Sequence, residues 1–175
     1  MNTLGIIKKT RDYLDYVEEH VKNVQEAWRI IQVHCKDLSF ITNEQVRSII
    51  DEEVQNHDLS KLSSKEFVQY RNNFYTCDDE PKNTKDFDKA WEHHKHNNHH
   101  HWEMWSTKAY NSQYARYINI VHNVCDWVAM GIKFGDSAIS YYENNKQEII
   151  IDKKHEDFMY EIFNLIYDEN RELKC

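Results

Sequence analysis

The sequence predicts an all-α fold, a single compact bundle of about six helices that spans residues 1–175. Three glycines and one proline are too few for a fold that depends on tight hairpin turns. Long segments also repeat apolar residues at steps of three and four, which is the period of an amphipathic helix. Aromatic residues are abundant, so a chain of this length can bury a core as one domain.

The first expected helix covers about residues 10–34. Its apolar face is formed by residues three or four apart, namely Leu14, Val17, Val21, Val24, Trp28 and Ile31. His20 follows Val17 by three positions and precedes Val24 by four, so we expect its side chain to point toward the core.

Capping signals predict the next two helices. Thr42 and Gln45 have the spacing of a capping box, so a second helix is expected to begin at Thr42 and to end near residues 57–58. Ser63 and Glu66 repeat that spacing and predict the start of a short third helix.

Three further helices are expected in the second half of the chain. Residues 87–105 keep helical spacing, but their middle, KHNNHHH, is poor helix-forming material and is expected to distort or break the helix. A long apolar helix is expected from 112 to 134, with Gly135 as its stop. The last expected helix covers about residues 155–170.

Composition narrows the class of protein. A formal net charge of −8 argues against binding of polymeric nucleic acid, which requires a basic surface. The chain has no signal-peptide pattern and no apolar run of about eighteen residues, so no membrane segment is expected. The four cysteines, Cys35, Cys77, Cys125 and Cys175, are dispersed without a C-x-x-C pair, which indicates a reduced, cytoplasmic protein. The composition is also compatible with a homo-oligomer.

His57 and Asp58 are adjacent at the expected end of the second helix. An imidazole nitrogen and a carboxylate oxygen can bind the same divalent cation. Lys61 follows Asp58 by three positions, so we expect its ammonium group on the same side, where it can bind a phosphate oxygen. These residues predict a metal site beside a phosphate-binding cation.

The long helix at 112–134 carries a polar face within an apolar segment. Asn119, His122 and Asp126 share this face at steps of three and four. A buried carboxylate is costly unless it is paired or binds a metal, so we expect Asp126 to be a metal ligand. An ion pair between Asp126 and a lysine or arginine is the structural alternative.

Residues 93–101 contain six histidines. His94 and His101 are seven positions apart and share a helix face if the helix continues, and His93 and His100 form the equivalent pair one position earlier. The flanking apolar residues favour His94 and His101 as ligands. Adventitious metal binding by a solvated histidine-rich loop is the alternative.

The segment HDLSKL resembles the His-Asp-x-x-Lys core of the HD superfamily of metal-dependent phosphohydrolases. Members of that superfamily take their metal ligands in the order His, His-Asp, Asp, each from a different helix. The resemblance therefore implies an HD-like bundle in which His20, the pair at 57–58 and Asp126 bind the metal. His34 remains the alternative first ligand. In the two-metal members, extra histidines fall between the His-Asp pair and the final Asp, where His94 and His101 lie.

The chain also resembles an uncharacterised family of bacterial and phage proteins. The shared motifs are HDLSK followed by EF, A-W-x-H-H, N-x-H-H-W and D-W-x-x-M, and the resemblance covers about residues 10–145. One position departs from a related group, because the nucleotide monophosphatases of the HD superfamily carry an acidic residue where this chain has Lys61.

The resemblance implies a metal-dependent phosphohydrolase acting on a small phosphorylated metabolite, with nucleotides as the expected class. One or two divalent ions (Mn, Fe, Co, Ni or Zn) would polarise a phosphoryl oxygen and activate a water molecule. Asp58 is expected to bridge two metal ions, or to hold one ion and orient the nucleophile. Lys61 is expected to neutralise charge on the phosphoryl group, and His122 to protonate the leaving oxygen. Two alternatives remain: an HD-type di-iron oxygenase and a non-catalytic metal-binding interaction module.

Overall fold

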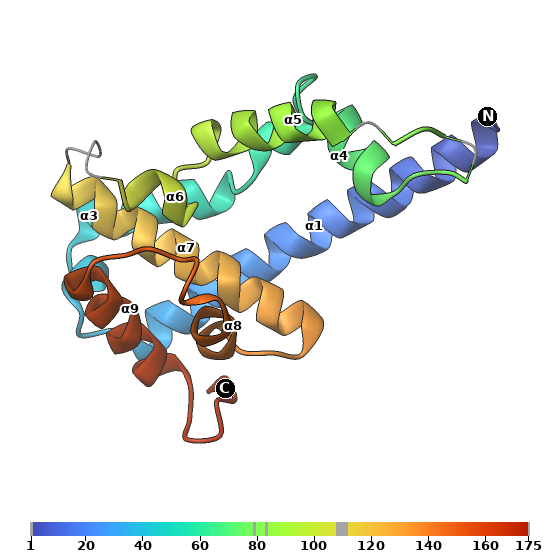
Figure 1. Cartoon of the computed structure of the whole chain (residues 1–175). Coiled ribbons are helices and arrows are strands. Elements are labelled where there is room, and N and C mark those ends of the chain that lie inside the picture. The colour runs from blue at the N-terminus through green and yellow to red at the C-terminus, as the bar shows by residue number, and fades with distance from the viewer. Residues whose placement is uncertain (1, 79, 83, 108–111, 175) are drawn as a thin grey trace. The chain divides into compact units, whose positions relative to one another are not determined.

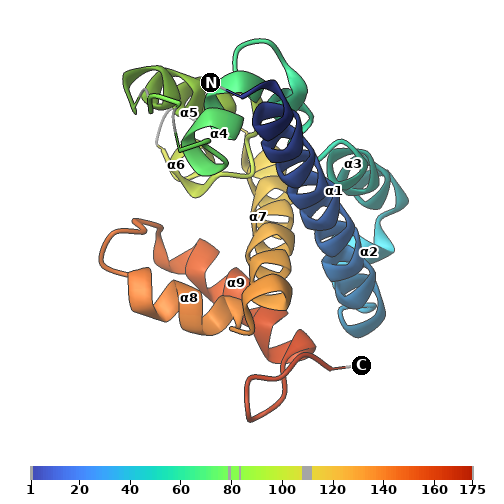
Figure 2. The ribbon, with the colours of Figure 1, turned by 90° about the vertical axis from the view of Figure 1, so that its right-hand side faces the viewer.

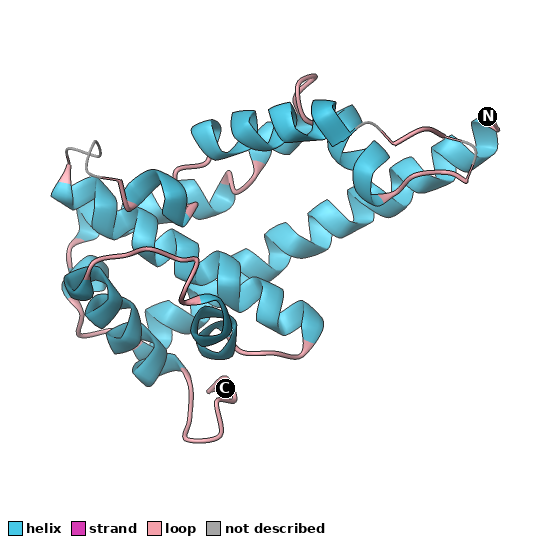
Figure 3. Ribbon diagram, viewed as in Figure 1, coloured by secondary structure: helices cyan, strands magenta, loops and turns pink. Residues whose placement is uncertain are grey.

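A computed structural model describes residues 2–78, 80–82, 84–107 and 112–174 (Figure 1). Over these residues the chain forms nine α-helices and one 3₁₀ helix and no strand (Figure 3), which confirms the all-α prediction. The chain divides into two compact units. Unit 1 comprises residues 1–19 and 58–98, and unit 2 comprises residues 20–57 and 99–175. The single HD-like domain expected over the whole chain stays a prediction.

Helix α1 (Thr3–His34) begins earlier than the expected start near residue 10. Its residues up to Glu19 belong to unit 1 and the others to unit 2. In the unit 2 part, the predicted apolar face is buried, as the exposed fractions of Val24 and Ile31 (both 0%) show. The period of three and four therefore placed most of this face correctly, but Val21 is half-buried and Leu14, in the unit 1 part, is 41% exposed.

Unit 1 contains helix η1 (Leu59–Leu62), α4 (Phe67–Phe74) and α5 (Thr84–Asn97) beside the first part of α1. Helices α4 and α5 pack against each other and against η1 (Figure 2). Aromatic rings fill the space between these elements in edge-to-face contacts: Tyr13 with Phe67, and Phe87 with Tyr70 and Phe74.

Unit 2 is organised around α7 (Gln113–Phe134). Four helices pack against α7 (Figure 1): α3 (Glu44–Gln55), α6 (Trp102–Trp105), α8 (Ala138–Asn145) and α9 (Lys153–Ile166). The short α2 (Ser39–Thr42) packs against α3. Contact on several sides explains why α7 is buried around most of its circumference, with thirteen buried residues over its length.

Two predicted helix caps are wrong. Thr42 ends α2, and α3 is instead capped by Asn43, whose Oδ1 accepts hydrogen bonds from the backbone of Gln45 and Val46. Glu66 is fully buried and binds other side chains of unit 1, so it does not form the expected capping box with Ser63. Local spacing suggested a cap in both cases, but the neighbouring Asn43 took the place of Thr42, and tertiary contacts took the carboxylate of Glu66.

The ends of the later helices agree better with the sequence. Ser112 caps α7 by accepting a hydrogen bond from the backbone of Ala115, and Gly135 ends it in the left-handed conformation with φ of 74°. Helix α9 ends at Ile166, earlier than the expected end near residue 170. Helix α8 was not predicted.

Within the described part of the chain, no helix is long and apolar enough to cross a membrane. Cys35, Cys77 and Cys125 are free thiols, and Cys175 lies outside the described residues.

Candidate metal centre

Four histidines and one aspartate gather in the interior of unit 2. This histidine cluster consists of His20 on α1, His57 in the turn after α3, His100 before α6, and His122 and Asp126 on α7. The four histidines are 2–4% exposed. Burial of so many imidazoles is unusual for polar groups and requires that they bind one another or a ligand.

The first group within the cluster contains His20, His57 and Asp126. The Nε2 atom of His57 lies 3.0 Å from Nε2 of His20, which in turn lies 3.1 Å from Oδ1 of Asp126. His57 Nε2 and Asp126 Oδ1 are 3.8 Å apart. Two ligand atoms that each lie about 2.1 Å from one ion, with a right angle between the two bonds, are about 3 Å apart. Two imidazoles with a carboxylate also form a common donor set for divalent transition metals. These three residues therefore fit a metal ion.

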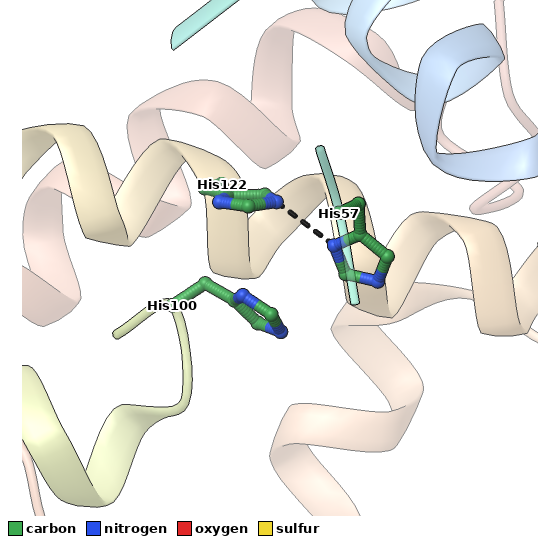
Figure 4. Close-up of side chains that lie close together, drawn as sticks. All are labelled: His57, His100 and His122. Atoms are coloured by element: carbon green, nitrogen blue, oxygen red, sulfur yellow. Dashed lines mark hydrogen bonds between the residues drawn. The ribbon is translucent and has the colours of Figure 1, made fainter. Parts of the chain in front are cut away.

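The second group lies on the other side of the His57 ring. The Nδ1 atom of His57 is 2.9 Å from Nε2 of His122. The His100 ring approaches both, with centroids 4.6 Å from His57 and 4.4 Å from His122 (Figure 4). One nitrogen from each of these three histidines lies within 4.8 Å of the others, so they too could hold a metal ion.

Local structure explains how these side chains meet. His122 and Asp126 are four positions apart on α7 and therefore share a face, as the sequence predicted. The carbonyl of His100 accepts a hydrogen bond of 3.0 Å from Nε1 of the fully buried Trp105, which fixes the backbone of His100. His34 ends α1 roughly four turns beyond His20, about 21 Å along the helix axis, so His20 is the histidine of α1 that belongs to the cluster.

A second polar cluster lies in unit 1 around Glu66, which is 0% exposed. Its carboxylate contacts Nδ1 of His93 at 2.6 Å and Nδ1 of His94 at 2.9 Å, and it accepts a hydrogen bond of 2.9 Å from Ser60 Oγ. Burial raises the pKa of Glu66, but the hydrogen bonds from His94 and His93 outweigh it, so the pKa lies below its usual value. Glu66 is therefore a buried anion that holds two histidines.

Asp58 joins the same cluster from the opposite side of His94. Its Oδ1 atom lies 3.1 Å from His94 Nε2, and its Oδ2 atom lies 2.5 Å from Lys61 Nζ. Burial lowers the pKa of His94, but hydrogen bonds to Asp58 and Glu66 raise it further, so the net shift is upward. A protonated His94 between two carboxylates must lose a proton before it can bind a metal. Asp58 has a φ of 58°, a left-handed conformation that aspartate tolerates better than most residues.

A family model described as "Family of unknown function (DUF5662)" matches residues 9–169. The chain belongs to this family. No curated protein and no solved structure matches the chain. The DUF5662 match includes every residue of both clusters.

In this DUF5662 protein the predicted site residues fall in both units. Unit 1 contains Asp58, Lys61 and His94, and unit 2 contains His20, His57, His101, His122 and Asp126. His94 and His101 would share a helix face only if the helix continued between them, and it does not: α5 ends at Asn97, and His101 directly precedes α6. A role of either residue as a ligand, and of Asp58, stays a prediction.

Two residues of the DUF5662 clusters were missed or ranked second. Glu66 was interpreted as part of a helix cap, and no local signal distinguishes a capping glutamate from a buried one. His100 was the alternative to His101, and it is the member of the histidine tract that contacts His57 and His122. The helix breaks at Asn97, as the weak helix propensity of the tract predicted, so helical spacing does not relate His94 to the histidines at 99–101.

Proposed function

We propose that this DUF5662 protein is a metal-dependent phosphohydrolase that acts on a small phosphorylated metabolite, with nucleotides as the expected class. The observation that supports this best is the convergence of His20, His57 and Asp126 in the interior of unit 2. They come from three separate elements in the order that the HD resemblance implies. Phosphohydrolases of that superfamily use such ligands to hold a divalent ion.

His20 and His57 would hold the ion through their Nε2 atoms, and Asp126 would contribute a negative charge that offsets part of the ion's charge. The ion would supply a Lewis acid that polarises a phosphoryl oxygen and lowers the pKa of water. Nδ1–H of His57 then donates to Nε2 of His122 at 2.9 Å, which fixes the tautomer and the orientation of the His57 ring. His122 is thus a positioning residue in this proposal, and its expected role as the acid stays a prediction.

Lys61 lies in unit 1, and its expected role in phosphate binding stays a prediction. Its ammonium group contacts the carboxylate of Asp58 and lies 5.6 Å from the centroid of the Tyr70 ring. The Lys61 side chain is only 12% exposed, so its charge is poorly screened by solvent. The anion beside this ammonium group is Asp58, so a phosphate oxygen would have to share or replace that contact.

The test is a screen of phosphate monoesters that includes nucleoside monophosphates. Metal-free protein would be reconstituted in turn with manganese, iron, cobalt, nickel and zinc. We expect phosphate release that stops with chelator, and a loss of at least about 100-fold in Asp126→Asn because one ligand charge is removed. Asp157→Asn is the matched control, since that carboxylate is 62% exposed on α9. Metal-loaded protein that releases no phosphate from any monoester would contradict the proposal.

A second candidate, an iron-dependent oxygenase of the HD type, is favoured by one observation. Two histidines and one carboxylate, as in His20, His57 and Asp126, are the ligand set of many non-haem iron oxygenases. Oxygen consumption by the iron-loaded protein, without phosphate release, would select this candidate. Retained metal without either activity would select the non-catalytic binding module.

A further inference from the structure

We propose that His57, His100 and His122 form a second metal position, suited to zinc, and that it competes with the His20–His57–Asp126 position for one histidine. The competition part of this inference rests on the proposed function, because it requires the first position to exist. The three-histidine position itself stands on the geometry of unit 2 alone.

The three rings converge on a common space (Figure 4). Their candidate ligand nitrogens all lie within 4.8 Å of one another, and His57, His100 and His122 are 3%, 2% and 2% exposed. One of these separations, 2.9 Å between His57 Nδ1 and His122 Nε2, is close to the spacing of two ligands on one ion. Small movements of side chains would therefore suffice to bind an ion.

The donor chemistry differs between the two positions. Three imidazoles offer nitrogen only and no negative charge, which suits zinc, copper or nickel. The position with Asp126 adds a carboxylate oxygen and one negative charge, which suits harder ions such as manganese as well. The cluster therefore discriminates between ions by the side of His57 on which they bind.

His57 cannot serve both positions as a neutral imidazole, because that form has one nitrogen lone pair and one N–H group. When Nε2 binds an ion, Nδ1–H donates to His122 at 2.9 Å. When Nδ1 binds an ion, Nε2–H donates to His20 at 3.0 Å. His122 thus orients His57 when the ion binds beside Asp126, and His20 orients His57 when the ion binds in the three-histidine position. One ion at a time is the expected stoichiometry.

Neighbouring residues hold His100 and His122 in place for this role. Trp105 fixes the His100 backbone through its indole N–H, as described above. On α7, Nδ1 of His122 faces the carboxylate of Glu53 at 3.9 Å. This leaves Nε2 of His122 directed at His57, which is the orientation that a ligand in the three-histidine position needs.

The experiment is a titration of full-length, metal-free protein with zinc and, separately, with manganese. It compares wild type with His100→Gln and Asp126→Asn, and cobalt absorption spectra report the ligand set. We expect His100→Gln to weaken zinc binding at least about tenfold and to leave manganese binding unchanged. We expect Asp126→Asn to weaken manganese binding by a similar factor and to retain zinc. His99→Gln is the matched control, because it alters an exposed residue of the same tract.

In wild type, zinc is expected to displace manganese with one equivalent bound in total. Zinc affinity that is unchanged in both His100→Gln and the second variant, His122→Gln, would overturn the three-histidine position. Two equivalents of zinc in wild type would overturn the competition. Manganese binding that survives Asp126→Asn would instead remove the position on which the proposed function depends. Thermal melts identify any variant that has lost its fold. If either His100→Gln or His122→Gln does not fold, the other variant tests the three-histidine position.

Discussion

Nε2 of His57 lies 3.0 Å from Nε2 of His20, although 37 residues separate the two in the chain. Two imidazole nitrogens at this distance share a proton, or they bind an ion together when both are deprotonated. The contact connects α1 with the turn after α3 in the interior of unit 2. Metal binding should therefore stabilise unit 2 in addition to enabling chemistry.

The first prediction concerns thermal stability. An ion that binds only the folded chain raises its stability by about 2.7 kcal/mol at a concentration 100 times the dissociation constant. We expect manganese to raise the melting temperature of wild type and to have little effect on His20→Gln. His34→Gln, altered on the same helix but far from the cluster, should respond like wild type. An equal response of His20→Gln and wild type would contradict the assignment of His20.

The second prediction concerns the buried carboxylate of unit 1. Glu66→Gln removes the charge that binds His93 and His94, so we expect a loss of roughly 2–3 kcal/mol in the free energy of unfolding. Glu92→Gln on α5 is the control, since that side chain is 60% exposed and its ion pair contributes little. Urea denaturation measures both. Equal stability of the two variants would show that Glu66 is not required for the fold of unit 1.

The third prediction uses two helical glycines. Replacing glycine by alanine usually stabilises a helix by about 0.5–1 kcal/mol. At Gly131 the added Cβ would approach the carbonyl oxygen of Asp136, a backbone atom, to less than van der Waals contact. We therefore expect Gly131→Ala to destabilise the protein, whereas Gly5→Ala, where the nearest atom is Cys77 Sγ at 3.6 Å, should be neutral or stabilising. Thermal melts that rank the two variants the other way would contradict the packing of α7.

The fourth prediction concerns pH. The Arg71 guanidinium binds Glu80 in unit 1 through two hydrogen bonds and lowers the pKa of that carboxyl from about 4.5 to about 2. A carboxyl whose pKa is lower in the folded state stabilises the fold at pH values above its pKa in the unfolded state. This contribution disappears as the pH falls from about 4.5 toward 2. Glu80→Gln should thus be less stable than wild type at pH 7, with a difference that shrinks below about pH 4.5.

The control for this series is the exposed pair of Lys89 and Asp86 in the same unit. Asp86→Asn should change stability little at any pH, because solvent screens the pair. A stability difference for Glu80→Gln that stays constant from pH 7 to pH 3.5 would show that the ion pair does not form in solution.

Much of the fold could be predicted because its longest segments have strong periodicity. The limits of α7 agree with the expected helix at 112–134 because a serine cap and a glycine stop mark its two ends. Helix α8 is as short as α4, and it was missed because its start, unlike that of α4, lacks the spacing of a capping box. The start of α3 was misplaced because Asn43 competed successfully with Thr42 as the cap.

The candidate site could be predicted in part for similar reasons. His20 was located by its position on a periodic face, and Asp126 by its isolation in an apolar helix. The contact of His100 with His57 depended on the path of the chain after α5, where the helix ends before the histidines at 99–101. Residue spacing alone carries no information across such a break, so His100 could not be selected.

The most direct test of the account is the metal content of untagged protein, measured by elemental analysis on wild type, His57→Gln and His99→Gln. His57 belongs to both proposed metal positions, so its loss removes every ion that the account places in unit 2. The account predicts one equivalent of a divalent transition metal in wild type and in His99→Gln, and none in a folded His57→Gln. A wild type without metal, or a His57→Gln variant that retains it, would contradict the central claim.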